Sequence, residues 1–417
     1  MQFQRPKGTR DIFGTELKRI EAVSSAACRF FGQSGYEEIK TPTFEFAQLF
    51  DRSIGERTDI VEHEMYKFEV SKKLYALRPE GTAPVLRAFI ENRLSLPARF
   101  FYVWPMYRRE KPQKGRYREF LQIGIELLGE GEPFYDAEII EQGKRFLHEI
   151  GARDFTIEIN SIGCPKCRTM YKKKLRNYLE PYFSDLCVNC QRRFERNFLR
   201  IFDCKMSPCQ KVYVDAPKIT DHLCPECLKH YNSVKKFLDM FGIAYRENKD
   251  LVRGLDYYTR TVVEFKHQSL GAQDTILAGG RYDLLMKELG GPDAPCTGWA
   301  MGVDRLLIAM PDDLPKIEEK KRFFIATIGQ RLINDTVALR DILQGNSFTC
   351  IMGNPEETLK LQLKSAHRVE AGYAIIYGED EAKEDVCTVR DMTSGKQEKI
   401  AIKDFASYLL KIRERKS

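Results

Sequence analysis

The 417-residue sequence has no long apolar run, since no stretch reaches the roughly 20 consecutive apolar residues that a membrane helix needs. Its first residues, Met1 to Gly14, lack the apolar core of a secretory signal peptide. These two absences exclude the signals for membrane insertion and secretion. The sequence therefore predicts a cytoplasmic protein with no membrane partner.

Two common nucleotide-binding loops are also missing. The sequence contains no Walker loop of the form GxxxxGK[ST], and no GxGxxG follows a predicted strand. It shows no internal repeat and no low-complexity tract. Its length predicts about two or three domains, and an apolar content of 43% is sufficient for their cores. If the protein uses a nucleotide, it must hold it by another scheme.

Positive charge is concentrated in one internal segment. Residues 161–250 contain 18 Lys and Arg against 10 Asp and Glu, a net charge of +8, whereas residues 323–417 contain 14 of each kind. The whole chain has a net charge of +7, so this segment carries the excess. It is expected either to face a polyanion or to be a solvated, lysine-rich helical surface. Charge alone does not decide between them.

Eight of the 12 cysteines lie in the same segment. They form four pairs, Cys164 with Cys167, Cys187 with Cys190, Cys204 with Cys209 and Cys224 with Cys227. In a cytosolic chain such pairs indicate metal or redox chemistry rather than structural disulfides. The first two pairs are 19 residues apart, as in a zinc ribbon, and four pairs supply thiolates for two sites. We expect structural zinc; the alternative is reduced, metal-free thiols.

The segment Arg118 to Gly129 alternates as a β-strand does. One face is aliphatic: Leu121, Ile123, Ile125 and Leu127. The other face carries Gln122 and Glu126 on either side of Gly124. A glycine inside a strand often marks the close approach of a ligand, so this face is a candidate binding surface. The alternative is a sheet with one wet face.

Other segments outline the domains. Residues 16–34 have apolar side chains at helical spacing and precede Gly35, which predicts a helix ending there. Residues 311–322, PDDLPKIEEKKR, predict a charged linker. Beyond it, a compact α/β domain is predicted, with strands over 323–328, 348–352 and 373–377 and helices over 333–343 and 359–371.

Four segments combine arginine with acids, amides or tyrosines. They are YALRPEGT (75–82), YRREKPQKGRY (107–117), LVRGLDYYTRTVVEF (251–265) and GWAMGVDRL (298–306). Each alone is a weak signal, but their order is specific. Together with RPKGTRDI (5–12), GYEEIKTPTFE (35–45) and AGGRYD (278–283), they resemble the histidyl-tRNA synthetase family, a class II aminoacyl-tRNA synthetase family. The resemblance runs nearly from end to end.

Each block resembles a particular element of that family. GYEEIKTPTFE is similar to motif 1, which forms dimers, YRRE to motif 2 and GWAMGVDRL to motif 3, while LVRGLDYYTRTVVEF and AGGRYD are similar to the histidine-specific blocks. In motif 3, Asp304 stands where the family more often has Glu, and Trp299 stands where Phe is common. Both replacements keep the chemical character of the position.

The resemblance implies an architecture. Residues 1–160 and 251–315 would form an α+β catalytic domain of the class II synthetase fold, on a mainly antiparallel sheet. Residues 161–250 would be a small, basic, Cys-rich helical insertion, which occurs in only part of the family, so the resemblance does not itself imply zinc. Residues 323–417 would be an α/β anticodon-binding domain.

The resemblance also implies a function and a mechanism. Such an enzyme, a homodimer, activates histidine with ATP and Mg²⁺ to histidyl-adenylate and then transfers the histidyl group to the 3′ end of tRNA(His). The carboxylate is already a nucleophile, so the enzyme must position the reactants and stabilise charge on the phosphate. Arginine suits this task. By resemblance, Arg108 holds the α-phosphate, Arg253 lies near it, Arg305 holds the γ-phosphate, Glu110 places the adenine and Arg116 reaches the outer phosphates.

Histidine recognition must satisfy an α-amino group and two different ring nitrogens. The resemblance assigns Glu80, Thr82 and Gln122 to the amino end, Glu126 and Tyr258 to the imidazole, and Tyr257 and Tyr282 to the lining of the pocket. Without the resemblance, the same residues would be surface acids and packed tyrosines. A buried carboxylate that needs a donor would reject apolar side chains of similar size.

Two other functions compete with the ligase. One is a histidine-sensing regulatory subunit of ATP phosphoribosyltransferase, a relative that typically lacks the anticodon module and the phosphate-contacting residues; here both are present. The other is a basic RNA-binding protein with zinc modules, which would not explain the ATP-type blocks. We further expect the basic insertion to clamp the acceptor arm of tRNA.

Overall fold

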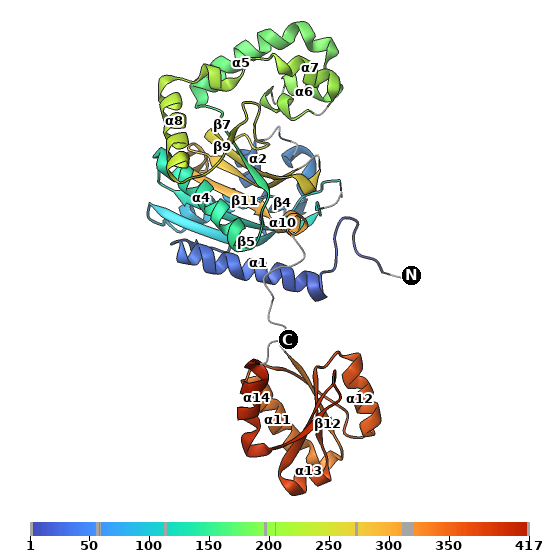
Figure 1. Ribbon diagram of the computed structural model, residues 1–417. Coiled ribbons are helices and arrows are strands. Elements are labelled where there is room, and N and C mark those ends of the chain that lie inside the picture. Colours follow the sequence, from blue (N-terminus) through green and yellow to red (C-terminus); the bar gives the residue numbers. More distant parts are fainter. Residues whose placement is uncertain are drawn as a thin grey trace. The chain divides into compact units, whose positions relative to one another are not determined.

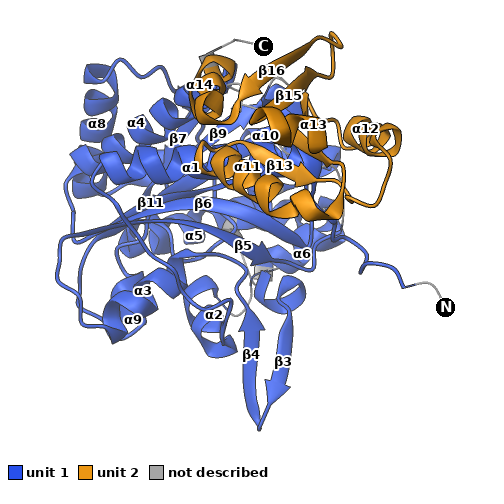
Figure 2. Ribbon diagram, turned by 90° about the horizontal axis from the view of Figure 1, so that it is seen from below, with its two compact units in different colours: residues 1–315 blue, residues 316–417 orange. Residues whose placement is uncertain are grey.

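The computed structural model describes residues 3–55, 58, 60–111, 115–195, 198–204, 206–271, 274–310 and 321–414. Most of the predicted linker, 311–320, and residues 112–114 of the motif 2-like segment lie outside the described residues. The chain divides into two compact units, Met1–Pro315 and Lys316–Ser417, which Figure 2 colours separately.

Unit 1 is built on an eight-stranded sheet. In spatial order its strands are β1 (Glu37–Glu38), β5 (Ala98–Tyr107), β6 (Glu119–Leu128), β11 (Cys296–Gly302), β10 (Thr275–Arg281), β9 (Thr259–His267), β7 (Phe155–Ser161) and β8 (Arg246–Glu247). All pairings from β5 to β7 are antiparallel, while the two-residue edge strands β1 and β8 pair in parallel. The predicted mainly antiparallel sheet is confirmed, and so is the strand predicted over 118–129.

Long helices cover one face of this sheet (Figure 1). They are α1 (Gly14–Gln33), α4 (Pro133–Glu149) and α8 (Pro225–Met240), joined by the shorter α10 (Val303–Ala309). The apolar stripe of α1, including Val23, Ala27 and Phe30, packs in one core with Ile123 and Ile125 of β6. This confirms both the helix predicted over 16–34 and the aliphatic face of the strand.

The opposite face of the sheet is partly covered by smaller elements. These are helices α2 (Ala47–Ile54), α3 (Thr82–Glu91) and α9 (Leu285–Glu288), a π-helical turn (Ile60–Glu64) and a three-stranded sheet of β2 (Phe44–Phe46), β4 (Lys73–Leu77) and β3 (Lys67–Val70). Phe100 and Tyr102 of β5 enter a second core on this face, whereas Phe101 enters the first, because strand side chains alternate.

The Cys-rich segment is helical and belongs to unit 1 (Figure 1). It contains α5 (Pro165–Leu179), α6 (Val188–Glu195) and α7 (Ser207–Val214), three short 3-10 helices (Glu180–Asp185, Phe198–Asp203 and Ile219–His222), and then α8. Tyr231, Val234 and Leu238 of α8 pack in the core beneath the main sheet, and β8 extends that sheet. The last third of the predicted insertion is therefore integral to the core of unit 1.

Unit 2 is an α/β domain. Its sheet has the order β13 (Thr349–Met352), β12 (Arg322–Thr327), β14 (Tyr373–Tyr377), β15 (Val386–Asp391) and β16 (Gln397–Ala401). Its helices are α11 (Ile333–Gly345), α12 (Leu359–Arg368), α13 (Glu379–Glu384) and α14 (Phe405–Glu414). Phe323 packs with α11 and α14, and Phe324 packs with α12, so both faces of the sheet are covered. The predicted α/β domain is confirmed.

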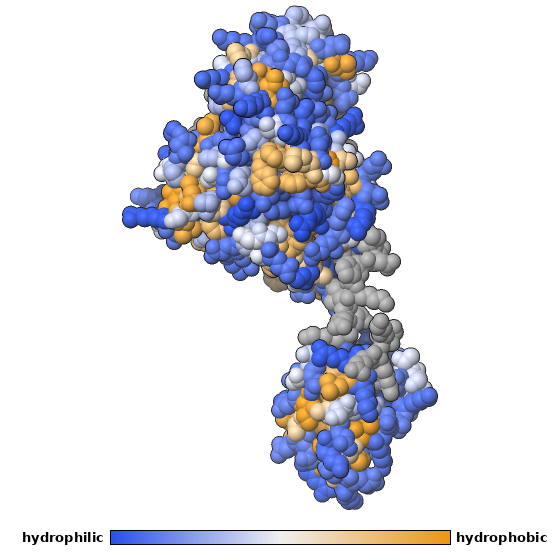
Figure 3. All heavy atoms as spheres, turned by 60° about the vertical axis from the view of Figure 1, so that its left-hand side comes forward, coloured by the Kyte–Doolittle hydropathy of each residue, from blue (hydrophilic) through white to orange (hydrophobic). Residues whose placement is uncertain are grey.

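The surfaces of both units carry apolar patches within a largely hydrophilic exterior (Figure 3). Among the described residues, no helix combines the length and the hydropathy that crossing a bilayer requires.

Candidate functional site

A cleft of about 620 Å³ opens on the face of the main sheet opposite α1. Ten of the twelve residues predicted to act on substrates line it: Glu80, Thr82, Arg108, Glu110, Arg116, Gln122, Arg253, Tyr257, Tyr258 and Arg305. They come from segments that are far apart in the sequence. The three arginines predicted to be catalytic therefore share one cavity with the polar face of β6.

Cationic side chains gather around Glu110 at one end of the cleft. Arg116 Nη1 lies 2.5 Å from Glu110 Oε2, and Arg108 Nη1 lies 3.7 Å from Glu110 Oε1. Arg108 is oriented by its Nε, which donates to the carbonyl of Pro79 at 2.8 Å. Burial lowers the pKa of Arg305, and the positive charge of Arg116 lowers it further. Such a group of cations favours an anion such as phosphate.

Arg253 reaches the cleft from the segment before β9. Its guanidinium pairs with Glu264 of β9 and lies 5.7 Å from the centre of the Tyr258 ring. Glu264 also accepts a hydrogen bond of 3.0 Å from Thr275 Oγ1 of β10. Sequence reasoning missed Glu264, although it lies in the histidine-specific block and alternation places it on the same side of β9 as the cleft.

Glu80 lies where β4 leads into α3. Its two carboxylate oxygens accept the backbone N–H groups of Thr82 at 2.8 Å and Ala83 at 2.9 Å. Burial raises the pKa of Glu80, and these N–H groups oppose the rise. Each oxygen keeps a lone pair for a ligand. The Glu-Gly-Thr sequence therefore holds a buried carboxylate at the edge of the cleft.

Glu126 lies behind the lining residues and is 1% exposed. Its carboxylate accepts hydrogen bonds from Thr82 Oγ1, at 2.8 Å, and from the hydroxyl of Tyr282. Burial raises the pKa of Glu126 to about 8, and both hydrogen bonds oppose this rise. Tyr282 was predicted to line the pocket; the structure places it behind the carboxylate, where it orients Glu126.

Gln122 lies four residues before Glu126 on the same face of β6 and lines the cleft. Its side chain is 9% exposed, and its Oε1 has no hydrogen-bond partner among the described residues. A buried amide oxygen normally has a donor. This atom therefore fits the amino group of a ligand.

Gly124 serves a different purpose from the one predicted. A Cβ at this position would lie 2.3 Å from the Tyr102 hydroxyl, and a Cβ at Gly81 would lie 2.3 Å from the same ring. The two glycines make room for the ring of Tyr102, which stacks on Trp104 at 4.5 Å and lines the cleft. The glycine thus admits a protein side chain rather than a ligand, and sequence reasoning missed Tyr102.

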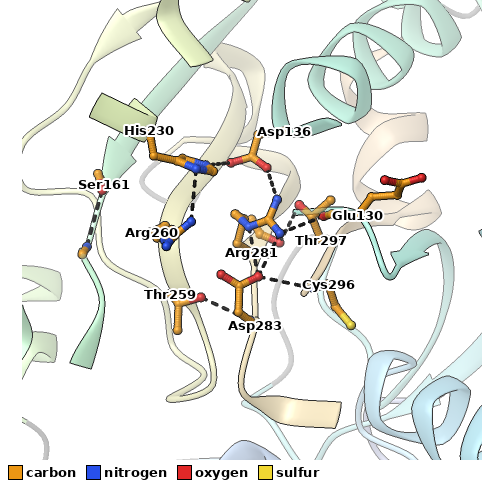
Figure 4. Close-up of polar contacts among 12 residues, drawn as sticks. Glu130, Asp136, Ser161, His230, Thr259, Arg260, Arg281, Asp283, Cys296 and Thr297 are labelled. Carbon is orange, nitrogen blue, oxygen red and sulfur yellow. Dashed lines mark hydrogen bonds and ion pairs between the residues drawn. The ribbon is translucent and has the colours of Figure 1, made fainter. Parts of the chain in front are cut away.

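A buried ionic network stands behind the pocket (Figure 4). Arg281, which is fully buried, donates from Nη1 to Asp136 Oδ1 at 2.5 Å and from Nε to Asp283 Oδ1 at 3.0 Å. His230 of α8 lies 2.8 Å from Asp136 Oδ2 and 3.2 Å from Arg260 Nη1. Burial alone would raise the pKa of Asp136, but the charge of Arg281 and the contacts with His230 and Thr261 together lower it. The network fixes Arg281 and Asp283, the residues on either side of Tyr282.

The two departures from motif 3 are accommodated by packing. Asp304 pairs with Arg10 and accepts the backbone N–H of Leu121 at 3.1 Å. The indole N–H of Trp299 donates to the carbonyl of Ile139 at 2.8 Å. Both side chains therefore connect the cleft strands to the helices beneath them.

The eight paired cysteines form two groups in space. Cys164, Cys167, Cys224 and Cys227 form one, and Cys187, Cys190, Cys204 and Cys209 form the other; within each group the sulfurs lie within 4.8 Å of one another and could hold a metal ion. The zinc-ribbon pairing of the first two pairs was wrong. The 15-residue helix α5, about 22 Å long at a rise of about 1.5 Å per residue, begins beside the first pair and carries the chain away from it.

Comparison with known proteins agrees with this geometry. A family model described as histidyl-tRNA synthetase matches residues 8–166 and 209–306, and an anticodon binding domain model matches residues 322–412. The chain belongs to the histidyl-tRNA synthetase family. The family catalyses histidine activation and tRNA charging. The stretch between the two matched parts, 167–208, contains most of α5 and all of α6.

Several relatives are similar over their whole length. A histidine–tRNA ligase of Thermosipho melanesiensis is 45% identical over 401 residues, which covers 95% of this chain and 95% of the relative. One from Desulforamulus reducens is 41% identical and covers 97% and 98%. The crystal structure of apo S. aureus histidyl-tRNA synthetase has a TM-score of 0.80 at 32% identity, over 98% of this chain and 99% of that one.

Proposed function

We propose that the chain is an ATP-dependent histidine–tRNA ligase that forms histidyl-adenylate and transfers the histidyl group to tRNA(His). Membership of the family supports the reaction. The observation that assigns the reaction to specific residues is the cleft that they share, with cations at one end and a buried amide and carboxylate at the other. The two substrates would meet between these ends.

In the first step, the residues of the cationic end would bind ATP. We assign Arg108 and Arg253 to the α-phosphate, where charge increases as the histidine carboxylate attacks. Arg116 and Arg305 would bind the outer phosphates. Glu110, which already pairs with Arg116, would position both that arginine and the adenine. Mg²⁺ would bridge the phosphate oxygens, mainly through substrate and water ligands.

Histidine would bind at the carboxylate end. Glu80, Thr82 and the unpartnered Oε1 of Gln122 fit the α-amino group, which is a donor. The Glu126 carboxylate would accept the N–H of one ring nitrogen, and Tyr258 would donate to the other. Tyr257 and Tyr102 would enclose the ring. An apolar ligand would leave Glu126 buried without a donor, so the site would select histidine over isosteres.

We further propose that the enzyme is a cytoplasmic homodimer. An exposed group of aromatic side chains on the small sheet supports an interface: Phe44 and Phe46 of β2 and Phe68 of β3 are 51%, 52% and 38% exposed. Clusters of this kind mark association sites. We also propose zinc as the metal of the four-cysteine groups, because thiolates are its preferred structural ligands.

The test of the function is pyrophosphate exchange dependent on both histidine and ATP, followed by charging of tRNA(His). Arg253→Gln should abolish exchange, whereas Arg29→Gln should not, because Arg29 forms only an exposed ion pair with Glu149 on the far side of unit 1. Binding of tRNA without exchange would instead support an RNA-binding protein. Histidine binding without exchange would support a regulatory subunit.

The basic insertion is the proposed contact for the acceptor arm of tRNA. Lys172 and Lys173 lie exposed on α5. Replacing both with Gln should raise the KM for tRNA and reduce its salt dependence, because each phosphate contact releases a counterion. The same loss of two positive charges at Arg29 and Arg145, which lie exposed on α1 and α4, is the matched control. An unchanged KM for tRNA in the α5 variant would contradict the clamp.

A further inference from the structure

The two cysteine groups have the dimensions of zinc sites. Four sulfurs held about 2.3 Å from one zinc ion in a tetrahedron lie about 3.8 Å apart. The Sγ atoms of Cys164 and Cys167 are 3.6 Å apart, and those of Cys187 and Cys204 are 3.8 Å apart. Both distances exceed the roughly 2.05 Å of a disulfide. In each group all four sulfurs lie within 4.8 Å of one another, which fits one ion with a closed coordination shell.

Backbone N–H groups point at the sulfurs, as they do around bound thiolates. The N–H of Cys224 donates to Cys167 Sγ at 3.1 Å, and the N–H of Cys187 donates to Cys209 Sγ at 3.2 Å. Hydrogen bonds of this kind favour the charged form of a group. Four soft thiolates and no oxygen donor select zinc over magnesium or calcium.

The first group, which we call the proximal cluster (Cys164, Cys167, Cys224 and Cys227), joins two helices at their first turns. Cys164 immediately precedes α5, and Cys224 immediately precedes α8. A metal bound here would fix the N-terminus of α5 against that of α8. The second group is the distal cluster (Cys187, Cys190, Cys204 and Cys209). It joins the start of α6 to the start of α7 and to the end of the 3-10 helix between them.

The helix α5 holds the histidine-specific segment directly. Arg168, the residue after a proximal ligand, donates from Nη1 to the carbonyl of Tyr258 at 3.1 Å and to that of Asp256 at 3.3 Å. The N–H of Arg260 donates to the carbonyl of Gly163 at 3.0 Å. The backbone on both sides of Tyr258 is thus attached to the two ends of the first cysteine pair.

The helix α8 holds the same segment from its other side. His230, one turn beyond the Cys227 ligand, contacts Arg260 and Asp136 (Figure 4). Arg260 can only donate, so His230 Nδ1 accepts its hydrogen bond. The ring proton of His230 is then on Nε2, which donates a hydrogen bond to Asp136. Asp136 in turn pairs with Arg281, the residue before Tyr282. Movement of α8 relative to α5 would therefore disturb Tyr258 and Tyr282.

We propose that the chain binds two zinc ions, one in each cluster, and that the proximal ion positions the histidine pocket. It does so by fixing α5 against α8, which together hold the segment 256–260 and, through Asp136 and Arg281, Tyr282. The distal ion orders α6 and its neighbouring 3-10 helix. The positioning role rests on the proposed histidine–tRNA ligase activity, whereas the metal content does not.

The experiment measures metal and kinetics on the full chain. The native chain purified without chelator should contain two zinc ions, and Cys164→Ser and Cys187→Ser should each contain one. Cys28→Ala, which changes a cysteine of α1 outside both clusters, should keep two. Cobalt substitution should give the absorption of thiolate-bound cobalt. In exchange assays, Cys164→Ser should raise the KM for histidine more than Cys187→Ser does.

Arg168→Met separates positioning from folding, because it leaves all eight thiolates in place. It should keep two zinc ions and raise the KM for histidine about tenfold, the effect of losing charged hydrogen bonds, with a smaller change in the KM for ATP. Arg168→Lys should restore part of the loss. These variants keep the proposal testable if Cys164→Ser fails to fold.

Three results would overturn the proposal. They are a native chain without zinc, an Arg168→Met variant with the native KM for histidine, and equal effects of the proximal and distal cysteine variants on that KM. A native chain that binds two zinc ions but shows no histidine-dependent exchange would overturn the ligase function instead and leave the metal sites standing.

Discussion

Tyr282→Phe is the most informative change in the histidine pocket. It removes the hydroxyl that donates to the buried Glu126 carboxylate and leaves the ring in place. Burial already raises the pKa of Glu126 to about 8, and the Tyr282 and Thr82 hydroxyls oppose the rise. Loss of one donor therefore raises this pKa further. The change is confined to protonation because the phenyl ring still fills the space behind the carboxylate.

The size of the effect follows from the strength of the lost bond. A hydrogen bond to a charged group contributes about 1.5–3 kcal/mol, which corresponds to about one to two pKa units. At pH 7 a carboxyl group with a pKa of about 8 is about one-tenth ionised, and after a further rise it is about one-hundredth ionised or less. Only the ionised form accepts a ring N–H without competition. The KM for histidine at pH 7 should therefore rise about tenfold or more.

Rising pH ionises Glu126, which should strengthen histidine binding and lower the stability of the fold. As pH rises through 8, Glu126 ionises and the native KM for histidine should fall; in Tyr282→Phe the fall should occur at higher pH. Because the pKa of Glu126 in the folded chain lies above the ordinary glutamate value of 4.5, this carboxyl stabilises the fold most below pH 4.5. That contribution is lost as pH rises through about 8.

The assay is pyrophosphate exchange at varied histidine concentration between about pH 6.5 and 8.5, a range in which the titrations of free histidine affect all variants equally. Tyr171→Phe is the matched control. Its hydroxyl also donates one hydrogen bond, to the carbonyl of Pro217 at 2.8 Å, but Tyr171 belongs to α5 and does not line the cleft. The reasoning is refuted if Tyr282→Phe and Tyr171→Phe share one pH profile of KM.

Three further changes test the packing of the pocket, the freedom of a helix glycine and the buried ionic network. In Gly298→Ala the new Cβ would lie 2.3 Å from Glu126 Oε2, so we expect a cost of about 1–3 kcal/mol in urea denaturation and a raised KM for histidine. Gly32→Ala, in α1 with open space around it, should stabilise the chain by about 0.5–1 kcal/mol. Arg281→Met leaves Asp136 charged and buried, so the free energy of unfolding should fall by about 3–5 kcal/mol, and an unchanged value would contradict the ionic network.

Local periodicity was sufficient to predict which residues of β6 face the cleft. Side chains alternate along any strand, so Gln122 and Glu126 had to share a face, and the structure places them on the cleft side. Local periodicity also predicted β12, β13, β14, α11 and α12 of unit 2, but not β15, β16, α13 and α14. Assigning these residues to histidine required the resemblance, because alternation does not say what a polar face binds.

The depth of each residue in the pocket could not be predicted from sequence. Glu126 pairs in register with Gly298 of β11. Because Gly298 has no side chain, the Glu126 carboxylate can reach Tyr282, which directly follows β10, and becomes buried there. Tyr102 occupies the cleft because Gly81 and Gly124 leave space on either side of it. These relations depend on the order β5-β6-β11-β10, and strand order is a property of the whole sheet.

The pairing of the cysteines shows why spacing alone misleads. Two cysteine pairs close in sequence can form one site only if the chain between them reverses direction. Between Cys167 and Cys187 the chain instead continues as the 15-residue helix α5, which leads away from the first pair. Cys167 therefore meets Cys224, 57 residues later, at the start of the helix that bears His230. The same long-range contact explains why no local pattern marked Asp136 or His230. His230 lies three residues after Cys227 on α8, and Asp136 meets it from α4, 94 residues earlier in the chain.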